Sequence, residues 1–425
     1  MYRNPILRLT SSYIVGVTQL KPFSEGAPSQ KEAGNEVNCV TPNKEGSQSH
    51  RYESYVMQTG ERPAAYRQSK TFTVGGTRSI IRLPNGSLLA VYSRPNAGGT
   101  AIFCTHSSDR GRTWADLGQI AQDAQPETDM GDGALVRSRT GDLFYAYRHN
   151  HYRGKQATAP DYAIRVSVSR DNGSHWNAYS TVTSHTLPEK RGPSQGLWAP
   201  FLFEAPDGRL QCYYDDEKTP LDAGFPGHQW LMMRTWEPST KTWERPVVVS
   251  RAHDPKHLSR DGMGTVVALS KNRLLCPLES VEVMPPHANL VRAVFSDDGG
   301  KTWSWQRGER AVLYSPQKTD FMALSPYLTR LSDGTVLCIF CTDEDRDLPN
   351  RSGTPPHLLT MDVKVVRSRD AAKTWSRSET ISTSHRAYLP GIVETRRGEL
   401  LAVWMDFVAG KTLGKYADGD GTSPV

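Results

Sequence analysis

The sequence predicts an all-β fold, a six-bladed β-propeller, and three observations support this prediction. A motif of the form Ser-x-Asp-x-Gly-x-x-Trp, or a near copy, occurs four times, at 107–114, 169–176, 296–303 and 368–375. A second pattern, polar turn residues followed by a β-rich run, occurs six times, and few segments show helical periodicity. A long motif that recurs about every 60 to 70 residues is typical of an array built from one supersecondary unit.

The first motif has the residues of a hairpin turn that is held closed by hydrogen bonds and contacts of its own side chains, and we call this arrangement the clasp. The Asp accepts hydrogen bonds from N–H groups of the turn, the Gly supplies a positive φ, and the Trp covers the loop with an apolar face. In the fourth copy Ala371 and Ala372 replace the Gly, so we expect that turn to relax. The segment that ends at Trp243 keeps only the tail of the motif. We interpret these motifs as structural parts of the outer hairpins.

The second pattern sets the number of blades. It begins at six positions, Leu83, Ser138, Ala205, Leu269, Leu331 and Thr395. Each copy reads as a turn followed by a strand. With roughly four strands per repeat, the six copies predict a six-bladed ring that leaves no sheet edge open. A stack of β-sandwich domains is disfavoured, because sandwiches do not require one clasp per repeat.

Composition divides the chain into three parts. Residues 1–68 are rich in Ser, Gln, Asn, Glu and Gly, which indicates a low-complexity or disordered N-terminal segment. Residues 69–415 form the predicted propeller, and 416–425 a C-terminal tail. The short apolar stretch at 13–17 lies among polar residues, so the sequence shows no clear signal peptide. No run approaches the 18 or so apolar residues that a membrane-spanning helix needs.

Charge and cysteine content argue against a nucleic-acid partner, a disulfide framework and a zinc finger. The net charge of +6 is modest and mixed along the chain, which does not favour nucleic acid as a partner. Most of the six cysteines lie in strand runs, so buried thiols are expected rather than a disulfide framework. No spacing is typical of a zinc finger, and we expect neither a metal nor another cofactor.

In a propeller, function is expected at the axial face, where inner strands and the loops between blades converge. Polar and aromatic residues follow strands at equivalent points in successive repeats: Asp129, Asp132, Arg148 and His149, then Tyr214, Asp216, Glu217 and His228, then His253 and Arg260. Such mixtures bind carbohydrates by hydrogen bonding and aromatic stacking. Each cluster taken alone is also compatible with a solvated loop or a salt bridge, and His253 with His257 also with a metal pair.

The motifs resemble the Asp-boxes, or BNR repeats, of the sialidase (neuraminidase) superfamily, and the stretch from about Thr71 to Lys411 resembles a sialidase-type six-bladed propeller. True sialidases carry an Arg in the first blade, and Arg78 lies at that point. Tyr388 matches the position of their nucleophilic Tyr. Their acid/base Asp has no counterpart, because no carboxylate occurs between Arg94 and Ser107.

Inner residues more closely resemble the exo-arabinanase-like glycosidases of this superfamily. Those enzymes carry one catalytic Glu in a Trp-Glu-Pro-Phe segment and another at a strand end in the following blade. This chain has Trp198-Ala199-Pro200-Phe201 and a strand that ends near Glu279. Ala199 therefore replaces the first Glu, although glycoside hydrolysis of the usual kind needs two carboxyl groups.

The resemblance implies an exo-acting glycoside hydrolase that cleaves a terminal sugar in an axial pocket. The expected catalytic residues are Glu279, Tyr388, Asp132 and Asp216. The expected substrate-binding residues are Arg78, Asp129, Arg148, His149, Trp198, Tyr214, Glu217, His228, His253 and Arg260. An exo-α-sialidase, a non-catalytic glycan-binding propeller and a polysaccharide lyase remain alternatives. The expected partner is a carbohydrate, and a secreted or periplasmic location is compatible with that partner. The sequence does not identify the sugar or the oligomeric state.

Overall fold

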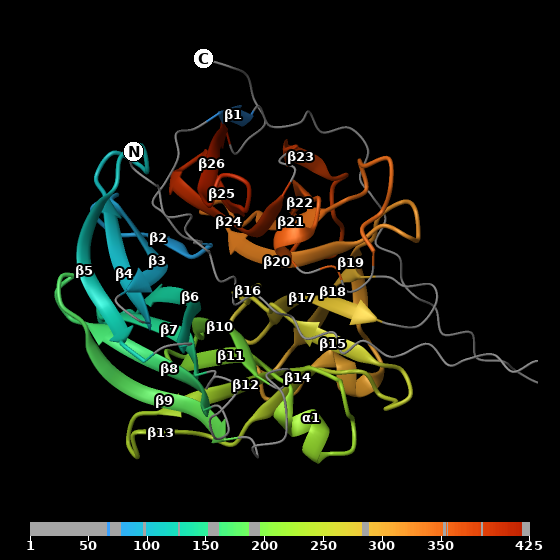
Figure 1. The fold of residues 1–425 in the computed structure, drawn as a ribbon, viewed down its shortest axis with the longest axis horizontal. Coiled ribbons are helices and arrows are strands. Elements are labelled where there is room, and N and C mark those ends of the chain that lie inside the picture. Colours follow the sequence, from blue (N-terminus) through green and yellow to red (C-terminus); the bar gives the residue numbers. More distant parts are fainter. Residues whose placement is uncertain are drawn as a thin grey trace, which may run out of the picture.

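A computed structural model describes the chain at residues 66–68, 78–96, 99–125, 128–151, 161–186, 196–282, 289–351, 354, 356–383 and 386–418. Six antiparallel sheets are arranged in a ring, as predicted (Figure 1). The described part contains one short α-helix, α1 (Lys218–Asp222), and two 3-10 turns, η1 (Ser304–Arg307) and η2 (Pro356–Leu358). The predicted tails, 1–68 and 416–425, lie mostly outside the described residues.

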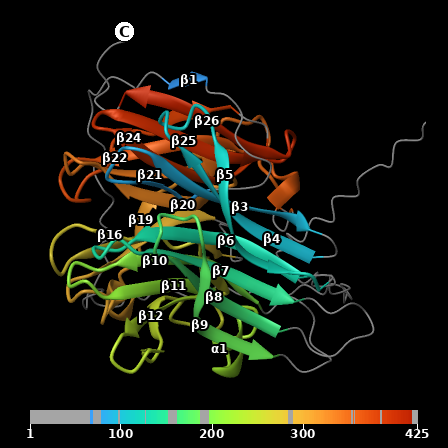
Figure 2. The ribbon, with the colours of Figure 1, turned by 90° about the vertical axis from the view of Figure 1, so that its left-hand side faces the viewer.

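The first three blades follow one another along the chain. Blade one contains β2 (Ile80–Arg82), β3 (Leu88–Asn96), β4 (Gly99–Ser107) and β5 (Ala115–Asp123). Blade two contains β6 (Thr128–Arg137), β7 (Leu143–His151), β8 (Asp161–Ser169) and β9 (Asn177–Thr186), which lie side by side in that order in Figure 2. Blade three contains β10 (Leu197–Glu204), β11 (Leu210–Asp216), β12 (Trp230–Glu237), β13 (Thr242–Trp243) and β14 (Val247–Ser250).

The remaining blades complete the ring. Blade four contains β15 (Ser259–Gly262), β16 (Val267–Ala268), β17 (Leu274–Glu282), β18 (Leu290–Ser296) and β19 (Ala311–Tyr314). Blade five contains β20 (Ala323–Arg330), β21 (Val336–Thr342), β22 (Asp362–Ser368) and β23 (Glu379–Ser382). Blade six contains β24 (Ala387–Arg396), β25 (Glu399–Asp406), β26 (Lys411–Asp418) and, at its edge, β1 (Tyr66–Gln68). The sheet of blade six therefore joins the two ends of the described chain.

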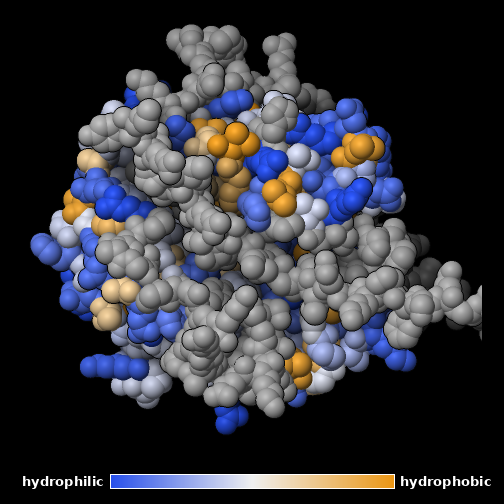
Figure 3. All heavy atoms as spheres, viewed as in Figure 1, coloured by the Kyte–Doolittle hydropathy of each residue, from blue (hydrophilic) through white to orange (hydrophobic). Residues whose placement is uncertain are grey.

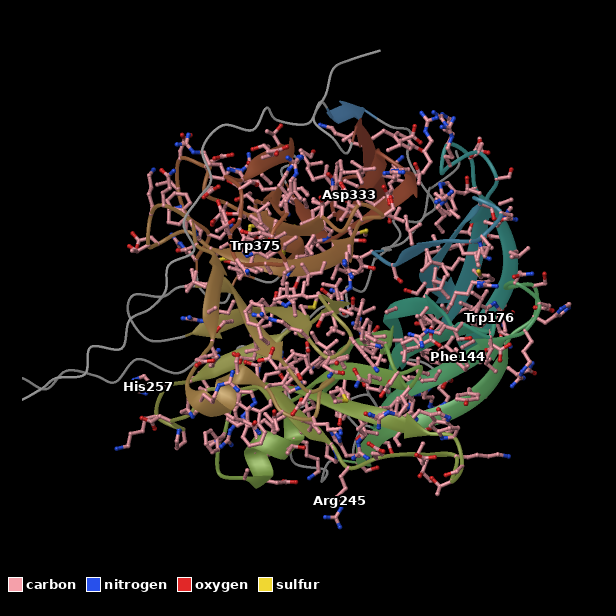
Figure 4. All side chains as sticks on the ribbon, turned by 180° about the vertical axis from the view of Figure 1, so that it is seen from behind. Phe144, Trp176, Arg245, His257, Asp333 and Trp375 are labelled. Carbon is pink, nitrogen blue, oxygen red and sulfur yellow. The ribbon has the colours of Figure 1, made fainter. Side chains whose placement is uncertain are left out.

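The Asp-box turns have the clasp geometry that the motif predicts. In the first copy the Asp109 carboxylate accepts hydrogen bonds from the backbone N and the hydroxyl of Thr113, at 2.8 and 2.6 Å. The Trp114 indole N–H donates to the carbonyl of Gly111 at 2.9 Å. These local contacts lock each turn between the third and fourth strands of its sheet. Figure 4 shows Trp176, from the second copy, toward the outer edge of blade two.

The fourth Asp-box does not relax, so that expectation was wrong. Ala371 and Ala372 adopt φ values of 59° and 65°, where the third copy has two glycines at 75° and 98°. The backbone N of Ala372 still donates to the Ser368 hydroxyl at 2.9 Å, and that of Thr374 to Asp370 at 2.9 Å. The clasp hydrogen bonds hold two alanines in a conformation that L-residues rarely adopt.

The core is continuous between neighbouring blades. Its largest apolar cluster takes buried residues from blades two to six, including Phe201, Trp303, Tyr327 and Tyr388. The five cysteines in the described residues are free and buried, as predicted. On the face seen in Figure 3, hydrophilic side chains predominate along the coloured part of the outer rim. None of the helices in the described residues has the length and apolar character needed to cross a membrane.

Candidate active site

The inner strands share one backbone distortion. A non-glycine residue with positive φ occurs at a corresponding place in five blades: Asp132 (52°), Ala199 (41°), Met263 (56°), Ser325 (55°) and Leu389 (48°). In four of them the pairing register shifts there, as expected of a β-bulge. Positive φ is uncommon outside glycine and often marks functional sites. Four of these residues lie in β6, β10, β20 and β24, the strands of their blades nearest the centre of the ring (Figure 1).

Ionisable side chains from five blades lie within electrostatic reach of one another around these bulges. We call Arg78, Asp132, Asp215, Glu279 and Tyr388 the central cluster. Burial raises the pKa of Tyr388 well above its usual value, the charges of Glu279 and Asp132 raise it further, and Arg78 opposes the shift. Burial likewise raises the pKa of Glu279, with an added contribution from Asp132. The structure therefore gathers Glu279, Tyr388, Asp132 and Arg78, which lie far apart in the sequence.

Glu279 is held at the centre by backbone contacts. It lies on β17, opposite Gly262 of β15, and one of its carboxylate oxygens accepts the N–H of Ser325 at 2.8 Å. Its side chain is only partly buried. That hydrogen bond, together with the charges of Arg78 and Arg260, lowers the pKa, but burial outweighs them. The result is a carboxyl group whose proton is retained to a higher pH than usual.

Asp132 has an ion-pair partner from the adjacent strand. One of its oxygens lies 2.8 Å from Nη1 of Arg148, while Nε and Nη2 of the same guanidinium contact Asp129 at 2.9 and 3.1 Å. The ring of Trp198 lies 5.7 Å from the guanidinium carbon, within cation–π range. Four of the predicted residues, Asp129, Asp132, Arg148 and Trp198, thus form one connected group.

Asp215 belongs to the central cluster although sequence reasoning selected its neighbour. Both of its oxygens lie 3.1 Å from the backbone N of Met263, and its side chain is almost fully buried. A Cβ on Gly262 would lie 2.7 Å from it, so only glycine permits this approach. Burial raises the pKa of Asp215 well above its usual value, and the charge of Glu279 raises it further.

Asp216 points to the opposite face of β11, where it stabilises a turn. Its carboxylate accepts the N–H groups of Lys218 and Thr219 at 2.8 and 2.9 Å and the Thr219 hydroxyl at 2.7 Å. These bonds account for Asp216, so we replace it by Asp215 as a candidate. The alternation of side chains along β11 was the signal that could have identified Asp215. Tyr213 packs in the largest core cluster, which also contains Tyr388, whereas Tyr214 packs in a separate core cluster. Asp215 therefore shares a face with Tyr213.

Three buried polar atoms near the centre have no hydrogen-bond partner among the described residues: Nη2 of Arg78, Oδ1 of Asp132 and Oγ of Ser325. Nη1 of Arg78 lies 4.0 Å from the Met263 sulfur, and its backbone carbonyl lies against Gly391, where a Cβ would approach it to 2.1 Å. Buried polar groups are nearly always paired. Three such atoms at one site are suited to the hydroxyl groups of a ligand.

Two further predicted residues form a bridge at the edge of the cluster. Glu217 accepts the N–H of Gly196 at 2.7 Å and pairs through its other oxygen with Arg260. Arg260 also donates to the side chain of Gln229 at 3.0 Å. The charge of Arg260 lowers the pKa of Glu279, so this ion pair holds a cation beside the central cluster.

Four predicted binding residues have other surroundings. Tyr214 is buried in the core and its hydroxyl lies 3.4 Å from Nε of Arg234. His149 contacts Asp123 at 2.8 Å, and His228 contacts the carbonyl of Pro255 at 3.1 Å. Burial lowers the pKa of both histidines. His253 is exposed and lies beside the ring of Trp305, with a centroid separation of 5.6 Å.

Two aromatic residues near the cluster were not predicted. Tyr145 and Tyr327 are buried, and the pKa of each is raised by burial and lowered by the charge of Arg78. Both lie in strands whose apolar pattern indicates core, so the sequence offered no signal for a functional role. In the described residues no group of three or more His, Cys, Asp or Glu side chains could hold a metal ion.

Comparison with known proteins supports the architecture. Residues 141–354 match the family model of the BNR repeat-like domain. No curated protein sequence matches the chain.

Many solved structures share the fold. An α-L-arabinanase of Penicillium chrysogenum, solved with arabinobiose, is 17% identical with a TM-score of 0.59, over 83% of this chain and 98% of that one. A GH93 α-L-arabinofuranosidase of Fusarium graminearum, also solved with arabinobiose, is 17% identical with a TM-score of 0.59, over 84% and 97%. A Hadza microbial sialidase is 15% identical with a TM-score of 0.52, over 83% and 66%.

Proposed function

Because this chain belongs to the BNR repeat-like domain family, we propose that its central cluster is the active site of an exo-acting glycoside hydrolase that removes a terminal sugar. The observation that carries the proposal is the convergence of Glu279, Asp132 and Tyr388, from three different blades, on one partly accessible site. The solved structures of similar fold include enzymes complexed with arabinobiose, which makes arabinosides the first substrates to test.

Glu279 is the proposed general acid. Hydrolysis needs a group that protonates the leaving oxygen, and a carboxyl group with a raised pKa keeps that proton near neutral pH. Burial provides the shift at Glu279. As the glycosidic C–O bond breaks, the anomeric carbon bonds to the enzyme nucleophile. In a retaining reaction the ionised Glu279 then accepts a proton from the water that displaces this nucleophile.

Asp132 is the proposed second carboxylate. Either Tyr388 is the nucleophile and Asp132 accepts its phenolic proton, or Asp132 is the nucleophile and Tyr388 orients it. Ala199 leaves blade three without a carboxylate at its bulge, whereas Asp132 supplies one at the corresponding bulge of blade two. The ion pair with Arg148 holds the orientation of Asp132. Arg78 and the hydroxyl of Ser325 are the proposed contacts to the sugar, because each has an unpaired polar atom.

Asp215 is proposed to act as a positioning residue. Its carboxyl group binds the backbone of Met263, which has positive φ, and lies against Gly262, the cross-strand partner of Glu279. This arrangement keeps the backbone beneath Glu279 in one conformation.

The experiment is a screen of the purified full chain on aryl glycosides of arabinofuranose, sialic acid, rhamnose and a uronic acid, with release of the aglycone as the readout. Glu279→Gln is expected to lower kcat by at least 10²-fold. Glu309→Gln, an exposed residue paired with Arg307, is the matched control and should leave activity unchanged. Undiminished activity in Glu279→Gln would remove Glu279 from the site.

A non-catalytic glycan-binding propeller is the second candidate, and Ala199 favours it, because it stands where the resembling glycosidases carry a catalytic Glu. Calorimetric titration with the same sugars separates the two. Binding without aglycone release on any substrate would support the second candidate. Formation of an unsaturated uronate product, followed by its ultraviolet absorbance, would indicate a lyase instead.

A further inference from the structure

A second candidate binding site lies on the outside of the ring, between blades two and three. A groove of about 670 Å³ is lined by residues of β9, β12 and β13 and of the turns beside them. We call it the outer groove. Its volume is within the range of small-ligand sites. Its chief lining residues are Tyr179, Trp236, Trp243, Arg170, Arg234 and Lys241.

The outer groove exists where the third blade departs from the Asp-box pattern. In the first three complete copies, the indole N–H of the Trp donates to a carbonyl of its own turn, at 2.9 to 3.1 Å. Trp243, in the degenerate copy, instead donates to the hydroxyl of Ser180 on the neighbouring blade, at 3.1 Å. The ring of Trp243 is therefore fixed across the gap between two blades.

Three aromatic rings form a continuous row in the groove. The ring centroids of Tyr179 and Trp236 are 5.0 Å apart, and those of Trp236 and Trp243 are 5.4 Å apart. Phe144 extends the row behind Tyr179, at 5.1 Å, and lies toward the outer edge of blade two (Figure 4). The planes of these rings are tilted by 48° and 62° to one another and Trp236 is buried, so the partly exposed rings of Tyr179 and Trp243 are the ones suited to the C–H groups of a sugar.

The charged residues of the groove are all cations. The lining contains two arginines and a lysine but no carboxylate. Lys241 is exposed, and the side chain of Arg170 is 65% exposed, with Asp142 3.7 Å away as a loose partner. Arg234 is anchored by its contacts to Tyr214 and to the carbonyl of Glu244. A ligand with regularly spaced negative charges would complement this arrangement.

We propose that the outer groove binds a segment of an acidic polysaccharide, a chain of uronic acid residues, with Tyr179 and Trp243 contacting sugar rings and the cations contacting carboxylates. The site would hold a polymeric glycan on the outside of the ring, independently of the central cluster, so it does not rest on the proposed function. Hydroxyl groups of Ser180, Thr181 and Thr242 along the lining add hydrogen-bonding partners.

The test measures binding of the purified full chain to polygalacturonate by affinity electrophoresis. Arg170→Ala combined with Lys241→Ala removes two exposed cations, and Trp243→Leu removes one of the two partly exposed rings. Each variant is expected to weaken binding at least tenfold. Lys301→Ala is the matched control, because Lys301 precedes Thr302 and Trp303 as Lys241 precedes Thr242 and Trp243. It should change binding less than twofold.

Three further measurements make the outcome decisive. Dextran tests for neutral sugar binding, polyglutamate tests for charge alone, and Glu279→Gln should bind polygalacturonate like the unaltered chain. Equal retention by dextran or by polyglutamate, or unchanged affinity in the double variant, would overturn the proposal. If Trp243→Leu does not fold, the double variant still tests the proposal, because Arg170 and Lys241 are exposed.

Discussion

Asp132 and Ala199 occupy the same backbone position in neighbouring blades. Both have positive φ, at 52° and 41°, and both lie where the pairing of the inner strand with the next strand shifts register. The fold imposes this conformation in five blades, so it provides several places at which a side chain can enter the centre. Loss of a carboxylate in blade three is therefore compatible with its supply from blade two.

Asp132→Asn is expected to lower kcat at least 10²-fold, because the amide cannot serve as a base or nucleophile. Asp129→Asn should have a smaller effect, since Asp129 also pairs with Arg148 but has no unpaired oxygen toward the cluster. Steady-state kinetics on the best substrate of the screen measures both. Equal losses in the two variants would indicate that only the ion pair with Arg148 matters.

The pH profile should report on Glu279. A general acid must be protonated, so kcat/KM is expected to fall as pH rises through the pKa of Glu279, above the value of about 4.3 for an ordinary Glu. The charge of Arg260 lowers that pKa, so Arg260→Gln should raise it and move the alkaline limb to higher pH. A limb that moves to lower pH would show that Glu279 is not the group observed.

Asp215→Asn should stabilise the protein more at pH 8 than at pH 4. The folded pKa of Asp215 is raised, so the native state retains a proton that the unfolded chain releases above about 3.9. Stability of the unaltered protein therefore declines as pH rises toward the folded pKa, and Asn removes this decline. Thermal unfolding across the range measures the difference in Tm.

Asp216→Asn is the neighbouring control for that measurement, since it alters the turn at Lys218 and not the cluster. A Tm difference for Asp215→Asn that does not vary with pH would contradict the assignment of a raised pKa to Asp215.

Ala371→Gly should raise the free energy of unfolding by about 0.5 to 1 kcal/mol. Ala371 is exposed with φ of 59°, and glycine relieves the steric cost of that conformation by more than it adds in chain entropy. Ala409→Gly, at an exposed turn residue without positive φ, should lower stability or leave it unchanged. Urea unfolding of both variants tests the sign.

The blade count and the clasps were predictable because both are local. An Asp that accepts hydrogen bonds from Thr113 four residues later, and a Trp that closes its own turn, depend on a few adjacent residues. Such contacts leave a motif in the sequence wherever they recur. The prediction that the fourth Asp-box turn relaxes was wrong because it considered only the replacement of Gly by Ala. Four hydrogen bonds act together to hold that turn.

The candidate site was predictable only in part. Glu279, Tyr388 and Asp132 were selected by their place at strand ends or by resemblance, and they lie in the central cluster. Asp215 lies there too, whereas the selected Asp216 does not. A shift of one residue along a strand reverses the face on which a side chain lies. Register against β10 and β12 decides that face, and register is a property of the assembled sheet.

By itself, the sequence determined the repeating unit, the number of blades and the identity of most charged groups that the ring brings together. Only the tertiary structure decided which of these groups meet, which are used in turns, and that Trp243 crosses to a neighbouring blade. The physical reason is range: hydrogen bonds within a turn span four or five residues, whereas the central cluster joins side chains up to about 300 residues apart, which only closure of the ring brings within reach.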